Sequence, residues 1–257
     1  PRTTAGLGTV TLLRHGESVG NAREIFSGVL DVDLTPAGEE ACTRAGTRLL
    51  ATGWSPDVVM TSELARGWRT ALLVEETLGS EAPVLRDWRL NERSYGALSG
   101  HLKTEVAERY GMEQFLHWRR SLHGRPPELD EATLTRWSRL SPFDRLPPEA
   151  LVPTESLADV VERMRPWVDD TLLAHVRAGE DVLVCAHGNS LRALCAILDR
   201  LTGEELKALN LPNARPLLYS FTAEDSGELR PTRHGGRYLD PEAAWAEAEV
   251  IAAQGGT

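Results

Sequence analysis

Two kinds of apolar pattern alternate along the chain. Short runs of consecutive apolar and β-branched residues are typical of strands buried on both faces, and they occur at Val10–Leu13, Val58–Met60, Val182–Cys185 and Leu217–Phe221. Between these runs, apolar residues recur at helical spacing, which is typical of helices with one buried face. The alternation predicts an α/β fold with a largely parallel sheet, because parallel strands need a crossover segment between them.

Capping signals and apolar spacing indicate where several helices lie. Thr35 followed by Pro36 is an N-cap with proline at the first helical position, and it predicts a helix to about Leu50. Apolar spacing predicts an amphipathic helix over residues 156–177, with Pro166 as a potential kink. Three further helices are expected: one after the capping box of Thr202 and Glu205, one over residues 241–253, and one that carries Arg192 to Leu198 behind a cap at Asn189 or Ser190.

The organisation of the chain is that of one domain. It has 257 residues without an internal repeat or a strong linker, so we expect a single domain over residues 1–257. Residues 122–153 are rich in proline and short of periodicity; they are interpreted as an insertion that covers another part of the molecule, with a plain surface excursion as the alternative. Glycines beyond the last expected helix suggest that the tail, residues 235–257, has a mobile end.

Charge and composition limit the partners. The net charge of −10 argues against nucleic acid and anionic membranes but leaves a small anionic substrate open, because local cations can dominate a pocket. No apolar run approaches the ~20 residues of a membrane span, and the N-terminal segment has no signal-peptide pattern. The three cysteines share no metal-ligand spacing and are expected to be reduced thiols of a cytoplasmic protein.

Two of the expected strands end in the same way. The first is followed by Arg14, His15 and Gly16, and the third by Ala186-His187-Gly188. Ligands of open α/β sheets bind beyond the carboxyl ends of the strands, and a glycine there lets backbone amides approach an anion. A single loop histidine more often has a structural role, but the repeated arrangement favours one site with two histidines.

Nearby arginines suggest phosphoryl transfer. Arg14 precedes the first histidine and Arg66 follows another strand; alone, Arg66 would be taken for a helix-surface residue. Guanidinium groups hold phosphate oxygens bidentately. A neutral imidazole can attack phosphorus to give phosphohistidine, and a second, protonated imidazole can stabilise the oxygens. The sequence contains neither a P-loop lysine motif nor an acidic metal cluster, so a metal-free route is expected.

Several ordered motifs carry a family resemblance. LLRHGES, with Asn21 beyond it, resembles the signature of the histidine phosphatase superfamily. WRLNERSYG, HWRRS, AHGNSLRAL, LNLP and the C-terminal RYLDPEAAWAEAEVIAAQGG narrow the likeness to the cofactor (2,3-bisphosphoglycerate)-dependent phosphoglycerate mutases, from Thr9 to the tail. The resemblance implies a three-layer α/β/α sandwich with a mostly parallel central sheet.

The resemblance also implies a role for each matching residue. His15 matches the nucleophile, His187 the histidine that stabilises the transition state, Arg14 and Arg66 the phosphate clamp, and Glu92 the proton donor and acceptor. Without the family, Glu92 would be an exposed loop acid. Substrate-binding roles are implied for Ser18, Asn21, Ser27, Gly28, Tyr95, Lys103, Arg119, Arg120, Gly188 and Asn189.

The chain also departs from the family pattern. Ser94 replaces the family's histidine beside Glu92, Val29 replaces a tryptophan, and Asn213-Ala214-Arg215 replaces a threonine-glycine segment. These changes leave the catalytic residues in place. They raise the question of whether phosphoglycerate or a related metabolite is the substrate.

Three functions follow from these observations. The first is a 2,3-bisphosphoglycerate-dependent phosphoglycerate mutase of glycolysis and gluconeogenesis, primed by 2,3-bisphosphoglycerate without a metal, that interconverts 3- and 2-phosphoglycerate through a phosphohistidine. The family further implies a homodimer or homotetramer. The second is a mutase-like enzyme or phosphatase for a different phosphorylated metabolite. The third is a family member that binds without catalysis, which the presence of every catalytic residue disfavours.

Overall fold

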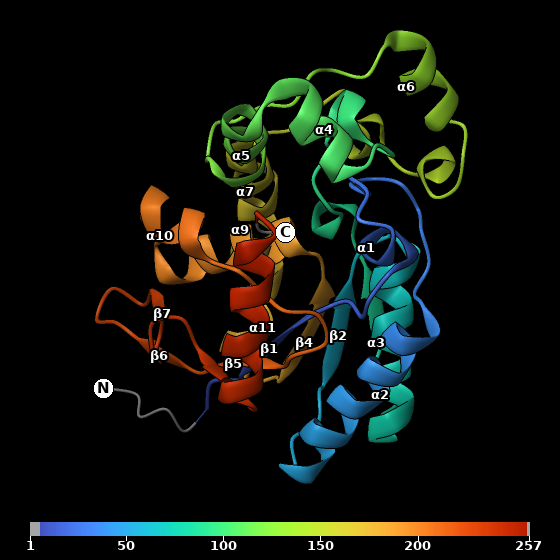
Figure 1. Ribbon diagram of the computed structural model, residues 1–257. Coiled ribbons are helices and arrows are strands. Elements are labelled where there is room, and N and C mark those ends of the chain that lie inside the picture. The colour runs from blue at the N-terminus through green and yellow to red at the C-terminus, as the bar shows by residue number, and fades with distance from the viewer. Residues whose placement is uncertain (1–5, 256–257) are drawn as a thin grey trace.

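A six-stranded sheet forms the centre of the molecule. The computed structural model describes residues 6–255 of the chain (Figure 1). The strand order is β3-β2-β4-β1-β5-β8, with bounds β1 Val10–Arg14, β2 Val58–Thr61, β3 Val84–Arg86, β4 Val182–Ala186, β5 Leu217–Tyr219 and β8 Arg237–Tyr238. The first four strands are mutually parallel, whereas β5 runs antiparallel to β1 and β8 antiparallel to β5. The prediction of a mostly parallel sheet is confirmed.

Helices cover both faces of this sheet. Every residue of β1 and β4 is buried, because alternate side chains enter two different cores. Val182 and Val184 pack with α7 (Leu157–Trp167) and α9 (Gly188–Asp199). Leu183 and Cys185 pack with α2 (Pro36–Ala51) and α3 (Ala65–Leu78) on the opposite face. The molecule is therefore the three-layer α/β/α sandwich that was expected.

Shorter elements gather at one end of the sheet (Figure 1). They are α1 (Val19–Ala22), α4 (Lys103–Tyr110), α5 (Met112–Arg120) and α6 (Glu131–Trp137), together with the 3-10 turns Trp88–Leu90, Gly96–Leu98, Phe143–Arg145 and Pro148–Ala150. The segment 122–153 contains α6 and two of these turns, and its Phe143 packs in one cluster with Val29 and Leu64. The segment 122–153 therefore packs against the loop at Val29 and the residue before α3; its interpretation as a covering insertion stays a prediction.

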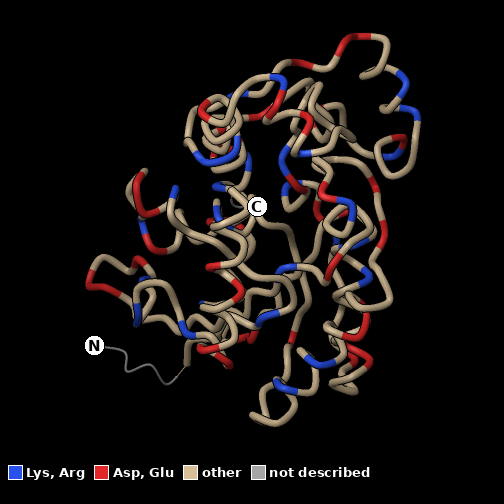
Figure 2. The backbone as a smooth tube through the Cα atoms, viewed as in Figure 1, with Lys and Arg blue, Asp and Glu red and all other residues tan. Residues whose placement is uncertain are grey.

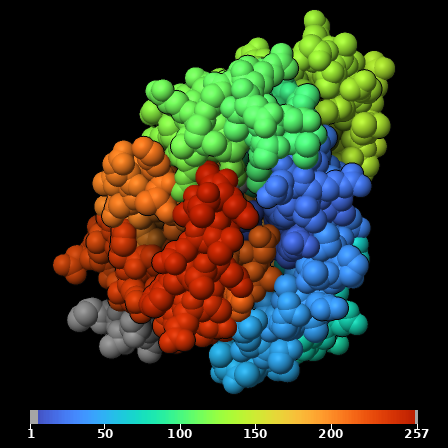
Figure 3. Space-filling model, in the orientation of Figure 1, coloured from blue at the N-terminus to red at the C-terminus, as the bar shows by residue number. Residues whose placement is uncertain are grey.

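The C-terminal part completes the sheet and adds a surface helix. A two-stranded sheet of β6 (Phe221–Ala223) and β7 (Leu229–Pro231) follows β5, α10 covers Gly203–Ala208, and α11 covers Pro241–Ala253. In Figure 3, α11 (red) lies on the surface beside the orange segment around α10. The predicted helix over 241–253 is confirmed, whereas residues 256 and 257 of the expected tail lie outside the described residues.

Two predicted elements differ in detail. The helix expected over 156–177 consists of α7, a π-helical turn at Val168–Leu172 just after Pro166, and α8 (Leu173–Ala178). The strand expected over Leu217–Phe221 is two strands, because β5 pairs with β1 and β6 pairs with β7.

None of the helices described within residues 6–255 combines the length and the apolar character that a membrane-spanning helix needs.

The start of α9 was also misassigned. Its N-cap is His187 rather than Asn189 or Ser190. The backbone N–H of His187 donates to the Ser190 hydroxyl (3.1 Å), so the serine contributes its side chain from inside the first turn. The helix therefore begins directly after the histidine.

Candidate active site

The two predicted histidines lie side by side at one edge of the sheet. β1 and β4 are paired in register, with Arg14 opposite Ala186, so His15 and His187 both follow directly at the carboxyl ends. Their ring centroids are 5.1 Å apart, and both side chains are buried. The structure therefore brings the two motifs together in one site.

His15 is held as a neutral imidazole with a defined tautomer. Its Nδ1 lies 2.6 Å from the carbonyl oxygen of Gly16. A carbonyl can only accept, so Nδ1 carries the proton and the lone pair remains on Nε2. Burial, followed by the charges of Arg66 and Arg14, lowers the pKa of His15 well below its usual value of 6.5. The geometry and the electrostatics both favour a nucleophilic Nε2.

Gly16 is required by the close approach of α2. A Cβ at this position would lie 2.4 Å from the carbonyl oxygen of Gly38 and 2.7 Å from the sulfur of Cys42. The glycine after the first histidine therefore allows α2 to pass directly behind the nucleophile.

His187 is held by a residue that the sequence analysis did not identify. Its Nε2 is 2.7 Å from the hydroxyl of Ser62, which follows β2 at the same sheet edge. Its Nδ1 is buried and has no hydrogen-bond partner among the described residues. Burial and the charge of Arg66 lower the pKa of His187 well below 6.5. These surroundings favour the neutral ring, and a nearby anion would raise its pKa again. The protonated form expected during phosphoryl transfer stays a prediction.

Two buried arginines flank the histidines. Arg66 lies in the first turn of α3 and donates to the carbonyl oxygens of Leu30 (2.8 Å) and Gly28 (2.6 Å). Arg14 donates to the carbonyl of Leu211 (2.8 Å), and its Nε has no partner among the described residues. Burial lowers the pKa of Arg66 to about 10, which keeps it charged at neutral pH. Arg66 is therefore a buried cation of the site and not a helix-surface residue.

Glu92 is buried beside the first turn of α9. Its side-chain oxygens accept from the backbone N–H groups of Arg93 (2.8 Å) and Asn189 (3.2 Å). Amides of a first helical turn lack intrahelical partners and favour anions. The side chain of Asn189 in turn donates to the hydroxyl of Tyr95 (3.0 Å). Glu92 is thus a fixed carboxyl group of the site and not an exposed loop acid.

These groups enclose a small cavity of about 40 Å³. Its lining includes most of the predicted residues: Arg14, His15, Ser18, Asn21, Ser27, Gly28, Arg66, Glu92, Tyr95, Lys103 and Asn189. Burial and the charges of Arg119 and Arg14 lower the pKa of Lys103 to about 7. A wider cavity of about 830 Å³ adjoins it through Arg14, Asn21 and Lys103, with the end of α11 in its wall. Figure 2 shows Lys and Arg positions near the C-terminus, below the place of α4 and α5 in Figure 1.

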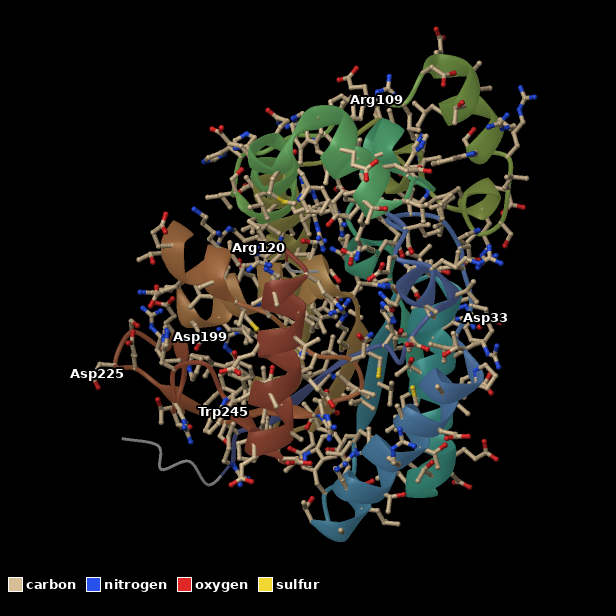
Figure 4. The ribbon with its side chains drawn as sticks, in the orientation of Figure 1. Asp33, Arg109, Arg120, Asp199, Asp225 and Trp245 are labelled. Carbon is tan, nitrogen blue, oxygen red and sulfur yellow. The ribbon has the colours of Figure 1, made fainter. Side chains whose placement is uncertain are left out.

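Four predicted residues line neither cavity: His187, Gly188, Arg119 and Arg120. Arg119 lies against the rings of Phe26 and Phe115 and donates to the carbonyl of Gln254 (3.1 Å), next to the cavity wall. Arg120 is directed away, toward the segment after α10, where it donates to the side chain of Asn210 (3.0 Å; Figure 4). Gly188 is the first residue of α9 and does not line the small cavity.

The departures from the family pattern do not face the small cavity. The Ser94 hydroxyl donates to the carbonyl of Val152 (3.1 Å), and Val29 is buried against the segment 122–153. Arg215 pairs with Asp240 and Glu247 of the C-terminal segment.

Asn213 lies closer to the chemistry than the other departures. Its side-chain amide donates to the carbonyl of His15 (2.7 Å). Ser62 and Asn213 are therefore site residues that the sequence analysis missed; the position of Ser62 at a strand end was the available signal.

The donor set does not suggest a metal centre. Over residues 6–255, no group of three or more His, Cys, Asp and Glu side chains is arranged to hold an ion. Converging guanidinium, ammonium and imidazole groups match a phosphorylated anion instead.

Comparisons with known proteins agree with this geometry. A family model described as the histidine phosphatase superfamily (branch 1) matches residues 10–143 and 128–229. A protein of Thermobifida fusca named 2,3-bisphosphoglycerate-dependent phosphoglycerate mutase is 46% identical over 250 residues, 97% of this chain and 100% of that protein. A protein of the same name from Corynebacterium efficiens is 46% identical over 251 residues, 97% of this chain and 98% of that protein.

Solved structures share the fold. The mycobacterial glucosyl-3-phosphoglycerate phosphatase in complex with VO3 superposes with a TM-score of 0.65 at 24% identity, over 90% of this chain and 100% of that chain. At this identity, the similarity shows only that the fold is shared. Membership of the family is shown by the match to the superfamily model and by the full-length relatives. The chain belongs to the 2,3-bisphosphoglycerate-dependent phosphoglycerate mutase family of the histidine phosphatase superfamily.

Proposed function

We propose that this protein is a 2,3-bisphosphoglycerate-dependent phosphoglycerate mutase that interconverts 3- and 2-phosphoglycerate through a phosphohistidine at His15. The proposal rests on the free Nε2 of a neutral His15. The ring centroid of His15 lies 5.1 Å from that of His187, and two buried arginines, Arg14 and Arg66, flank the pair. The names of its full-length relatives supply the substrate.

His15 acts as the nucleophile. Its Nε2 lone pair forms the N–P bond as the bond between phosphorus and the substrate oxygen breaks. Arg14 and Arg66 neutralise the phosphoryl oxygens from fixed, buried positions, so little reorganisation accompanies the reaction. His187 is oriented by Ser62, and the incoming negative charge favours its protonated form, which can donate to a phosphoryl oxygen.

Glu92 handles the proton. It donates a proton to the departing oxygen, and in the return step it accepts one from the substrate hydroxyl as that oxygen attacks phosphorus and the N–P bond breaks. His15 then receives the phosphoryl group from the other oxygen of the glycerate. Burial of His15 (3% exposed) keeps water from the N–P bond between the steps.

The residues of the site fit 2,3-bisphosphoglycerate. Arg14, which lines the small cavity, has a buried Nε without a partner among the described residues, so it can donate to a phosphoryl group held there. Lys103, between the two cavities, is placed to hold a second anionic group. When bound, 2,3-bisphosphoglycerate supplies the phosphoryl group that charges His15, and no metal is assigned to the reaction.

The alternative, a mutase-like enzyme or phosphatase for another metabolite, rested on Ser94 and Arg215. Both side chains are bound to other parts of the protein and do not line the small cavity. This placement favours phosphoglycerate over a changed substrate.

A direct assay separates these functions. We expect isomerisation of 3-phosphoglycerate that is accelerated by trace 2,3-bisphosphoglycerate and abolished in His15→Ala. Release of free phosphate faster than isomerisation would support the phosphatase, and no turnover in either assay would contradict both enzymatic functions.

The setting of the enzyme stays a prediction. We infer a small phosphorylated anion as its partner, a cytoplasmic location and a homodimer or homotetramer. The buried free thiols of Cys42, Cys185 and Cys195 support a reducing compartment.

A further inference from the structure

The loop that carries Glu92 has little regular structure of its own. Residues 91–94 lie between two 3-10 turns, Trp88–Leu90 and Gly96–Leu98. The Glu92 carboxyl is bound by the backbone N–H of Asn189 (3.2 Å), but the backbone of the segment depends on groups from other parts of the chain. The position of Glu92 therefore depends in part on the groups that bind this backbone. We propose that the buried ion pair of Glu155 and Arg163 is the positioning device that holds Glu92 for proton transfer. The proposal rests on the role of Glu92 in the proposed function.

Arg163 binds the loop on the N-terminal side of Glu92. Its guanidinium donates to the carbonyl of Asn91 (2.7 Å), to that of Glu92 itself (3.3 Å), and also to the carbonyl of Arg89. Its Nε donates to Glu155 (2.7 Å), which fixes the orientation of the planar group. The arginine thus binds the backbone carbonyl groups of three residues: two that precede the acid, and Glu92 itself.

Glu155 binds the loop on the other side. Its Oε2 accepts from the backbone N–H of Ser94 (2.8 Å), and its own N–H donates to the Ser94 carbonyl (3.0 Å). Its carbonyl accepts from the guanidinium of Arg93 (2.7 Å). The two partners therefore hold Glu92 between them without touching its carboxyl group.

The placement of Arg163 on α7, and of Glu155 just before the N-cap of this helix, supports this role. Ser156 and Asp159 form a capping box that starts α7 directly after Glu155. The apolar side of this helix, with Val160 and Met164, is buried in the core of the sheet. The pair is nearly buried, with side-chain exposures of 13% for Arg163 and 8% for Glu155. A rigid, core-anchored helix thereby sets the position of a loop that has no core of its own.

A double-mutant cycle tests the proposal on the full-length enzyme. The rate constant of His15 phosphorylation by 2,3-bisphosphoglycerate is measured in single turnover, as acid-labile phosphate, for the parent, Arg163→Lys, Glu92→Gln and the double variant. Lysine keeps the charge but cannot bind several acceptors in one plane. Arg165→Lys, an exposed site on the same helix, is the matched control, and Glu155→Gln replaces Arg163→Lys if that variant does not fold.

A positioning role predicts a specific pattern. Glu92→Gln slows phosphorylation by about 10²- to 10⁴-fold, as expected for loss of a general acid. Arg163→Lys slows it by about 10- to 100-fold, because the acid is misplaced, while the dissociation constant for 3-phosphoglycerate measured by calorimetry stays unchanged. In the Glu92→Gln background, Arg163→Lys causes no further loss. Arg165→Lys behaves like the parent.

Other results overturn one proposal or the other. If the effects of Arg163→Lys and Glu92→Gln multiply, or if Arg163→Lys weakens substrate binding instead of slowing the reaction, the pair does not act through Glu92. If Glu92→Gln itself reacts as fast as the parent, the assigned role of Glu92 is wrong, independently of the ion pair.

Discussion

At the scale of single residues, the reactivity of His15 comes from its surroundings. The Gly16 carbonyl selects the tautomer, and burial together with two arginines lowers the pKa of the ring. The same burial makes both histidines costly to protonate in the folded protein. His15 is therefore uncharged, and able to attack phosphorus, at neutral and mildly acidic pH. Lower pH reduces the stability of the folded protein, because the buried histidines are protonated more easily in the unfolded chain.

The stability of the protein is expected to fall with acid below about pH 6.5. The pKa of His15 is lower in the folded than in the unfolded state, so the unfolded chain binds more protons and the free energy of unfolding rises with pH. Each such histidine contributes about 1.4 kcal/mol per pH unit between its two pKa values. The free energy of unfolding, measured by denaturant titration at several values between pH 7 and 5, should change with pH less steeply in His15→Gln, by this amount per pH unit. An unchanged pH dependence would contradict the buried, neutral ring.

At the scale of elements, α3 approaches the site closely at Gly67. A Cβ on Gly67 would lie 2.5 Å from the Ser62 hydroxyl and 3.3 Å from Nε2 of His187. The absence of a side chain on this turn of α3 therefore preserves the Ser62–His187 contact.

Gly67→Ala should lower the isomerisation rate by about 10- to 100-fold, because it displaces Ser62 and misorients His187. The matched control is Gly203→Ala at the start of α10, where nothing lies near the added methyl group. That variant should keep full activity and gain about 0.5 kcal/mol of stability. Equal activity of the two variants would show that the orientation of His187 by Ser62 is unimportant.

The sequence predicted best those elements whose signal is local. Continuous apolar runs identified β1, β2 and β4, and the strand-end rule placed His15 and His187 at one edge. The family motif assigns Arg120 to the substrate, and this role stays a prediction. Its contact with Asn210 depends on tertiary packing and has no local signal in the sequence. The sequence analysis did not predict the ion pair of Glu155 and Arg163 for the same reason, since the backbone groups that it binds lie 61 to 74 positions away in the chain.

At the scale of the whole molecule, the charge of the exterior and that of the site have opposite signs. The chain carries a net charge of −10, yet Arg14, Arg66 and Lys103 line the cavity. The electrostatic field in a buried pocket is set mainly by the nearest charges. The acidic exterior therefore does not prevent binding of a phosphorylated anion. The cation introduced at Arg215 belongs to the exterior arrangement, where it joins α11 to the rest of the protein.

Arg215→Gln is expected to lower the free energy of unfolding by about 0.5 to 1 kcal/mol, the usual range for partly exposed ion pairs. Its preference for 3-phosphoglycerate over other phosphorylated acids and sugars should match that of the parent, because Arg215 does not line either cavity. Thermal unfolding and a substrate panel provide the two readouts. A changed preference with unchanged stability would assign Arg215 to the substrate.

The central claim is that phosphorus is transferred through Nε2 of His15. Phosphorus NMR of the protein mixed with 2,3-bisphosphoglycerate, together with peptide mapping at neutral pH, identifies the modified atom. We expect a single acid-labile phosphoramidate on Nε2 of His15 that disappears when 3-phosphoglycerate is added in excess and never forms in His15→Ala. Phosphate on Nδ1 or on any other residue, or full isomerase activity without a phosphorylated enzyme, would contradict the account.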